Sequence, residues 1–174
     1  MSTHEASPDL VGQIGDRLRE LSEFYVEVIA AVEAIITHAE AQHQRYQQAG
    51  SDVAGLYAAT AAAMRSIKTQ LTTAKTATAQ LMAEPPRLRG RDSDEEAAAE
   101  ARKLAEQLQH QHDLRSQAQR TLWDAQGRIA GALERQPSEF EPLDDALMRL
   151  GNFVSAARDT IEGFVTSAEG GPKR

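Results

Sequence analysis

The side chains best suited to metal binding lie in one short stretch of this sequence. Glu40 and His43 form a Glu-x-x-His motif, whose spacing places both side chains on one face of a helix. Helical bundles that hold two metal ions carry such a motif on each of two helices. This chain has one, because Glu106 and His110 are spaced one residue too far apart. We therefore expect no cofactor, and we keep Glu40, His43 and His112 as candidate ligands for an alternative function, a metal- or ligand-binding bundle.

Motifs for other kinds of catalysis are absent from the sequence. It contains neither a Gly-x-Ser-x-Gly nucleophile turn nor a Gly-rich phosphate-binding loop. It has no cysteine, so disulfides and thiolate metal sites are excluded. We predict that the protein is not an enzyme and has no catalytic residues.

The charge balance argues against two classes of partner. The formal net charge is −7, with 15 arginines and 4 lysines among the basic residues. An acidic chain repels phosphate groups, so we expect neither nucleic acid nor a membrane as partner. No apolar run approaches the ~20 residues needed to cross a bilayer, and segment 1–9 does not read as a secretory signal. A soluble, cytoplasmic protein is expected.

Four long helices are expected to position these residues. Apolar residues recur at alternating spacings of four and three, which is typical of helices packed in a left-handed bundle. Gly50, the segment 85–91 and Pro137 interrupt the pattern. Ser93 and Ser138 each precede a glutamate by three residues, as in a capping box. The predicted helices span about 8–49, 52–84, 93–136 and 139–168, within a single domain 8–169 that has flexible ends 1–7 and 170–174.

The first of these helices is expected to lie at the centre of the core. Val28, Val32 and Ile35 occupy the middle of its widest apolar arc, so we predict that they are among the most buried residues. Short connections make successive helices antiparallel. The predicted fold class is all-α, an elongated antiparallel bundle of four long helices with coiled-coil-like packing.

Polar residues interrupt the apolar stripe of the third helix. They are Gln111, His112, Arg115 and Gln119. One interpretation is a solvated or locally splayed stretch, and the other is a buried ionic layer that fixes how the helices align. Folding the hairpins back at their turns places Arg115 near Glu40 and Glu162, to within about one helical turn or more. The sequence leaves both interpretations open.

Several apolar residues fall outside the stripes that face the core. They are Val26, Leu114, Trp123, Ala125, Phe153 and Val165. A monomeric bundle needs one stripe per helix, so this excess is either a second packing surface or the ordinary scatter of apolar residues over a protein surface. Trp123 flanks its stripe, either as a core-edge residue or as a partly exposed anchor of the kind on which interfaces depend. Val26, Leu114, Trp123 and Phe153 are the candidate partner-binding residues.

These observations favour a protein that acts by binding, without catalysis. We predict a structural or assembly protein that binds another protein or itself through long amphipathic helices, with a homo-oligomer as the expected form. A further alternative is a secretion-associated helical substrate or chaperone. Type VII substrates carry a Trp-x-Gly turn and a Tyr-x-x-x-Asp/Glu signal. Here Asp124 and Ala125 follow Trp123, and no tyrosine has an acid at its fourth following position.

Overall fold

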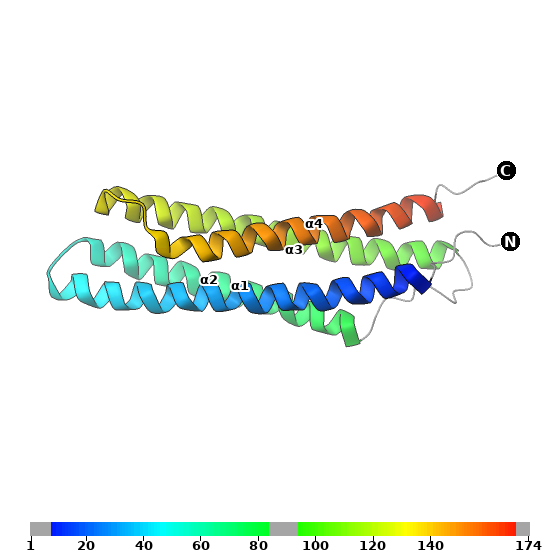
Figure 1. The fold of residues 1–174 in the computed structure, drawn as a ribbon, viewed down its shortest axis with the longest axis horizontal. Coiled ribbons are helices and arrows are strands. Elements are labelled where there is room, and N and C mark those ends of the chain that lie inside the picture. The colour runs from blue at the N-terminus through cyan, green and yellow to red at the C-terminus, as the bar shows by residue number, and fades with distance from the viewer. Residues whose placement is uncertain (1–7, 84–93, 170–174) are drawn as a thin grey trace.

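The computed structural model describes residues 8–83 and 94–169. The described residues form four long helices and a short 3-10 turn, and 94% of them are helical with no strand (Figure 1). The elements are α1 (Pro8–Gln48), α2 (Val53–Ala83), α3 (Asp94–Leu133), η1 (Ser138–Phe140) and α4 (Glu141–Glu169). These bounds match the predicted helices to within a few residues, and the predicted flexible ends lie outside the described residues.

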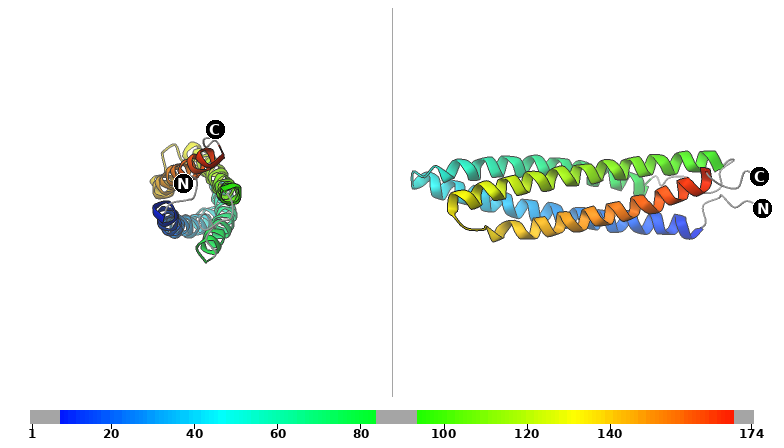
Figure 2. Two further views of the ribbon diagram at one scale, coloured as in Figure 1. Left: turned by 90° about the vertical axis from the view of Figure 1, so that its right-hand side faces the viewer. Right: turned by 90° about the horizontal axis from the view of Figure 1, so that it is seen from above.

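The four helices lie side by side as a rod (Figures 1 and 2). Successive helices run antiparallel, so the beginning of α1 and the end of α4 lie at one end of the rod and the α1–α2 turn at the other. Helix α1 packs closely along α2, and α3 along α4, while the seams between these two hairpins are thinner. The predicted fold class, an elongated antiparallel four-helix bundle, is confirmed.

The turn between α1 and α2 is built around a glycine, as predicted. Gly50 has a φ of 74°, in the left-handed region that glycine adopts without steric cost. The Ser51 amide donates to the Tyr46 carbonyl at 2.9 Å, which satisfies a carbonyl group at the helix end. The Ser51 hydroxyl in turn accepts a hydrogen bond from the Val53 amide at the start of α2.

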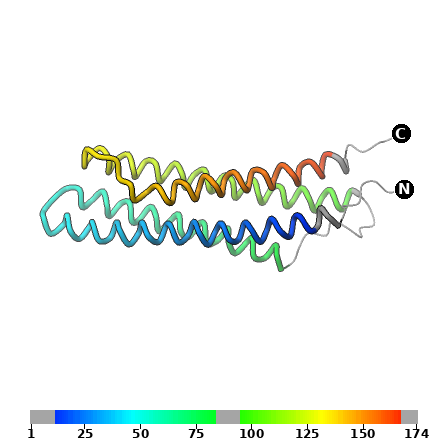
Figure 3. Tube along the Cα trace, viewed as in Figure 1, coloured from blue at the N-terminus to red at the C-terminus, as the bar shows by residue number. Residues whose placement is uncertain are grey.

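The end of α3 differs from the prediction. Helix α3 ends at Leu133, and Glu134 has a φ of 56° that breaks the helix before Pro137 is reached. The predicted capping box at Ser138 is wrong, because the residues there form a 3-10 turn whose N-cap is Pro137 and whose N-cap makes no side-chain hydrogen bond. The chain doubles back between α3 and α4 (Figure 3). The capping box predicted at Ser93 lies outside the described residues.

The core runs the length of the rod, and all four helices contribute buried apolar residues to it. Val28 and Val32 are fully buried and Ile35 is 2% exposed, so the predicted burial of the widest apolar arc of α1 is confirmed. Helix α2 contributes several small residues, such as Ala61 and Ala74. None of the described helices is apolar enough over a sufficient length to span a membrane.

The predicted alignment of Arg115 with two glutamates is wrong. Its guanidinium group lies against Gly151 of α4, about three helical turns from Glu162. Glu40 is ion-paired with Arg65 of α2 instead. The shift arises because the chain doubles back after α3, so α4 does not begin level with the end of α3.

Candidate functional site

The three candidate metal ligands make separate contacts. Glu40 is paired with Arg65, and His43 Nδ1 donates to the Ala54 carbonyl at 2.9 Å. His112 lies on α3 and contacts Arg115. Within 8–83 and 94–169, no three His, Asp or Glu side chains are grouped as a metal ion requires.

The distance along the bundle separates these candidates further. Gln111, the residue before His112, is hydrogen-bonded to Tyr25 of α1. His43 is about 18 residues beyond Tyr25 on the same helix, which corresponds to about 27 Å. Glu40 and His43 therefore do not share a site with His112.

The inner part of the polar stretch is a buried, neutral network that joins three helices. Gln111 is 3% exposed, and its Oε1 accepts a hydrogen bond from the Tyr25 hydroxyl at 2.7 Å. Its Nε2 donates to Thr78 Oγ1 of α2 at 3.3 Å, and that hydroxyl donates to the Ala74 carbonyl. Burial raises the pKa of Tyr25 and keeps its hydroxyl protonated. This Gln111 network is neither of the predicted arrangements, because it is not solvated and carries no charge.

The outer part of the stretch is a second network, which reaches the surface between α3 and α4. Arg115 Nη2 donates to His112 Nε2 at 3.2 Å, and Arg115 Nη1 donates to Gln119 Oε1 at 2.5 Å. Gln119 Nε2 donates to Asp144 Oδ1 at 2.9 Å, and Trp123 Nε1 donates to the same oxygen at 2.8 Å. We call these five residues the α3–α4 network. It places an amide between a guanidinium cation and a carboxylate.

A glycine makes room for the cation of this network. A methyl group at Gly151 would overlap the Arg115 guanidinium, so the arginine can lie across α4 only where α4 has no side chain. The Arg115 Nε atom is buried and has no hydrogen-bond partner. Burial lowers the pKa of Arg115, although a guanidinium group stays protonated at any ordinary pH.

His112 is held in its neutral form. Burial lowers the pKa of the His112 imidazole most, and the cations Arg115 and Arg158 lower it further, while Asp113 acts in the opposite direction. Its pKa in the folded protein is therefore below that in the unfolded chain, which is about 6.5. The unfolded chain binds the proton first, so His112 contributes stability above about pH 6.5 that is lost as the pH falls through the folded-state pKa.

The fit between Arg115 and Gly151 leads to a testable prediction. Glycine-to-alanine changes inside a helix ordinarily stabilise by about 0.5–1 kcal/mol. We expect Gly151→Ala to destabilise the native protein, because the methyl group displaces Arg115 from Gln119 and His112. In an Arg115→Ala background the same change should stabilise by about the ordinary amount. Urea denaturation of the four proteins measures the coupling.

Gly163 provides the control for this cycle. It lies in α4 with open space around its Cα, so Gly163→Ala should stabilise equally with and without Arg115. An equal effect of Gly151→Ala in both backgrounds would show that the guanidinium does not depend on the glycine.

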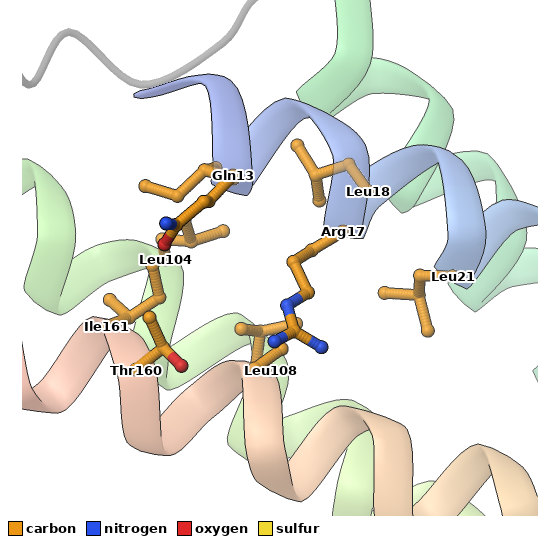
Figure 4. Close-up of a pocket in the computed structure, with 10 residues that line it drawn as sticks. Gln13, Arg17, Leu18, Leu21, Leu104, Leu108, Thr160 and Ile161 are labelled. Carbon is orange, nitrogen blue, oxygen red and sulfur yellow. The ribbon is translucent and has the colours of Figure 1, made fainter. Parts of the chain in front are cut away.

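A small cavity lies between α1, α3 and α4 (Figure 4). Leu18, Leu104 and Ile161 contribute to its apolar lining, and Gln13 and Arg17 extend into the space between the helices. Its volume of about 20 Å³ is close to what one water molecule requires and is far below that of a ligand pocket. It is a packing defect.

The structure divides the predicted partner-binding residues into two groups. Val26 and Trp123 are exposed, at 53% and 50%. Leu114 is half-buried against the core, and the half-buried Phe153 ring packs 5.0 Å from Phe24 of α1. Phe153 therefore contributes to the seam between α1 and α4, and its role in partner binding stays a prediction.

Two further apolar residues that lie off the stripes are also accounted for by the core. Ala125 is 8% exposed, so it belongs to the interior, contrary to the prediction. Val165 is half-buried at the edge of the core. Both fit ordinary packing within the bundle.

The exposed apolar surface beside the α3–α4 network centres on two residues. Trp123 is held through its indole N–H by Asp144, and Met148, 46% exposed, follows Asp144 by one helical turn. Two exposed charged residues flank them, Arg120 three residues before Trp123 and Asp145 three residues before Met148. We call Arg120, Trp123, Asp145 and Met148 the Trp123 patch. Neither of its charged side chains forms an ion pair with the described residues.

Comparison with protein-family models, with characterised proteins and with solved structures gives no match for this chain.

Sequence reasoning missed the residues of α4 that complete the outer network. Asp144 is one of several acidic residues at the start of α4, and the sequence does not distinguish it from them. Gly151 gave a usable signal, because a glycine inside a helical pattern often marks a close approach by another group. Arg158, which donates to Gln109 of α3, carried no such signal.

Proposed function

We propose that this protein is a non-enzymatic assembly protein, and that two copies associate through the Trp123 patch. The single observation that supports this most strongly is the state of Trp123. Its ring is half exposed, yet its indole N–H is already bound to Asp144. A large aromatic side chain fixed at the surface loses little conformational entropy when a partner covers it, which is what an interface anchor requires.

The charges of the patch support a second copy as the partner. An isologous dimer places the same patch on both sides, so each basic group can meet an acidic group of the other copy. Arg120 on α3 and Asp145 on α4 are both exposed and supply one charge of each sign beside the apolar pair. Neither forms an ion pair within residues 8–83 and 94–169. The patch is therefore self-complementary in charge.

Sedimentation velocity at micromolar concentrations tests the proposal. We expect the wild-type protein to form a dimer, and Trp123→Ala to raise its dissociation constant roughly 30-fold or more, because interface anchors typically contribute about 2 kcal/mol or more. Val26→Ala is the matched control, since Val26 is equally exposed but lies on α1. It should leave the dissociation constant within about threefold of wild type.

Charge-reversal variants test whether the partner is a second copy of the chain. Arg120→Asp and Asp145→Arg should each weaken the dimer, because each creates two like-charge contacts across a two-fold interface. The variant with both changes should recover most of the wild-type affinity. A wild-type protein that sediments as one 19.0 kDa chain at every concentration would refute self-association.

The expectations about enzymatic activity, other classes of partner and location are also part of the proposal. We propose no enzymatic activity, because the sequence carries no catalytic motif, and neither a nucleic acid nor a membrane as partner, because the chain is acidic. A cytoplasmic location is also proposed; the absence of cysteine leaves the compartment open and gives no argument for an oxidising one.

A further inference from the structure

We propose that His112 is a pH-sensitive control element, and that its protonation loosens the α3–α4 network and changes how Trp123 is held. The inference deepens the proposed function, because it assigns a means of regulation to the Trp123 patch. The change at Trp123 can nonetheless be measured whether or not the protein forms dimers.

The hydrogen bond between Arg115 and His112 is possible in only one protonation state of the imidazole. A guanidinium group donates hydrogen bonds and cannot accept them, so His112 Nε2 must carry a free lone pair to bind Arg115 Nη2 at 3.2 Å. A protonated imidazole has no such lone pair. Protonation therefore replaces a hydrogen bond with a contact between two cations.

The surroundings of His112 reinforce this effect. The charged groups that act on the imidazole are Arg115 and Asp113 from α3 and Arg158 from α4. Two of the three are cations, and both are in partly buried positions where solvent screens charge less than at the surface. A proton on His112 is thus repelled by both arginines. Protonation also removes the hydrogen bond between His112 and Arg115, so Arg115 is the residue expected to move.

Gln119 connects a movement of Arg115 to Asp144 and Trp123. The Gln119 amide is oriented from both sides, because its Oε1 accepts from Arg115 Nη1 and its Nε2 donates to Asp144 Oδ1. When Arg115 moves away, the buried amide loses one of its two partners. Asp144 Oδ1 also holds the Trp123 indole, so a change at that oxygen reaches the surface patch directly.

Intrinsic fluorescence provides a direct test, because Trp123 is the one tryptophan of the chain. We expect the wild-type emission spectrum to change between pH 8 and pH 5, with a midpoint below about 6.5, the pKa of an unperturbed histidine. His112→Gln should abolish this transition. It retains Asp144, so any emission change caused by protonation of that carboxylate would persist in the variant.

Two further variants separate the mechanism from general effects of pH. Gln119→Ala should uncouple Trp123, leaving a His112 titration that is visible by NMR but no matching change in emission. His43→Gln removes a histidine at the distant α1–α2 turn and should leave the wild-type transition unchanged. If His112→Gln does not fold, Gln119→Ala alone still decides whether the coupling exists.

The outcomes distinguish this inference from the proposed function. An emission transition that persists unchanged in His112→Gln or in Gln119→Ala overturns the inference, even if the protein is a dimer. A transition that is lost in both variants supports it, even if sedimentation finds only single chains. In a dimeric wild-type protein, the dissociation constant should also differ between pH 7.5 and pH 5.5, and His112→Gln should reduce that difference.

Discussion

Val32→Asp is expected to cost about 3 kcal/mol or more of folding free energy, the largest effect of any substitution proposed for this protein. Val32 is fully buried at the centre of the apolar arc of α1. A carboxylate there would lie within the hydrophobic core cluster and lose its contact with water. The protein must either bury an unpaired charge or bind a proton, and both are unfavourable at neutral pH. Chemical denaturation monitored by circular dichroism measures the loss.

The neighbouring surface of the same helix provides the control. Val26 is 53% exposed, so Val26→Asp makes the same chemical change at a solvated position. It should alter stability by about 0.5 kcal/mol or less. If Val32→Asp melted within a degree or two of wild type, the face of α1 that we describe as buried would have to be exposed.

Gln111→Leu is expected to destabilise the protein by roughly 1–3 kcal/mol, although it replaces a polar residue in the core with an apolar one of similar size. The Tyr25 hydroxyl is buried and would lose the acceptor that it binds at 2.7 Å. The Thr78 hydroxyl would lose a donor but still donates to the Ala74 carbonyl. The cost therefore falls mainly on Tyr25.

Removal of both partners should behave differently from removal of one. Tyr25→Phe takes away the stranded hydroxyl, so Gln111→Leu combined with Tyr25→Phe should recover most of the stability that Gln111→Leu alone loses. Urea midpoints of the three variants and wild type give the coupling. Strictly additive losses would mean that the two side chains do not depend on each other.

The sequence was sufficient to predict four helices and the turn between α1 and α2, although it did not predict the break at Glu134 that ends α3. Gly50 adopts a conformation that other residues rarely accept, and the apolar spacing identified Val28 and Val32 as core residues. These signals depend on residues close together in the chain. They specify each helix without specifying its neighbour.

These local signals could not predict how the helices align along the bundle. The prediction placed the turn at Pro137 and assumed that α4 starts level with the end of α3. The helix instead breaks at Glu134 and the chain turns back before α4 begins. Helix α4 is therefore shifted along α3 by about three helical turns from its predicted position. The contact between Arg115 and Gly151 follows from that displacement. Similarly, the sequence identified Gln111 and Gln119 as unusual core residues, but their partners lie on other helices and depend on the final packing.

The placement of the helix ends has a mechanical consequence. The beginning of α1 and the end of α4 lie together, so a stretching force applied between them would act across the helix axes. It would break the contacts of the thinner α1–α4 seam one turn at a time, which requires little force. Tension applied between the α1–α2 turn and the end of α4 would instead act parallel to the helix axes, along about 60 Å of bundle. The contacts between the helices would then bear the force together. The molecule should therefore resist tension along its length, yet open easily when the beginning of α1 and the end of α4 are pulled apart.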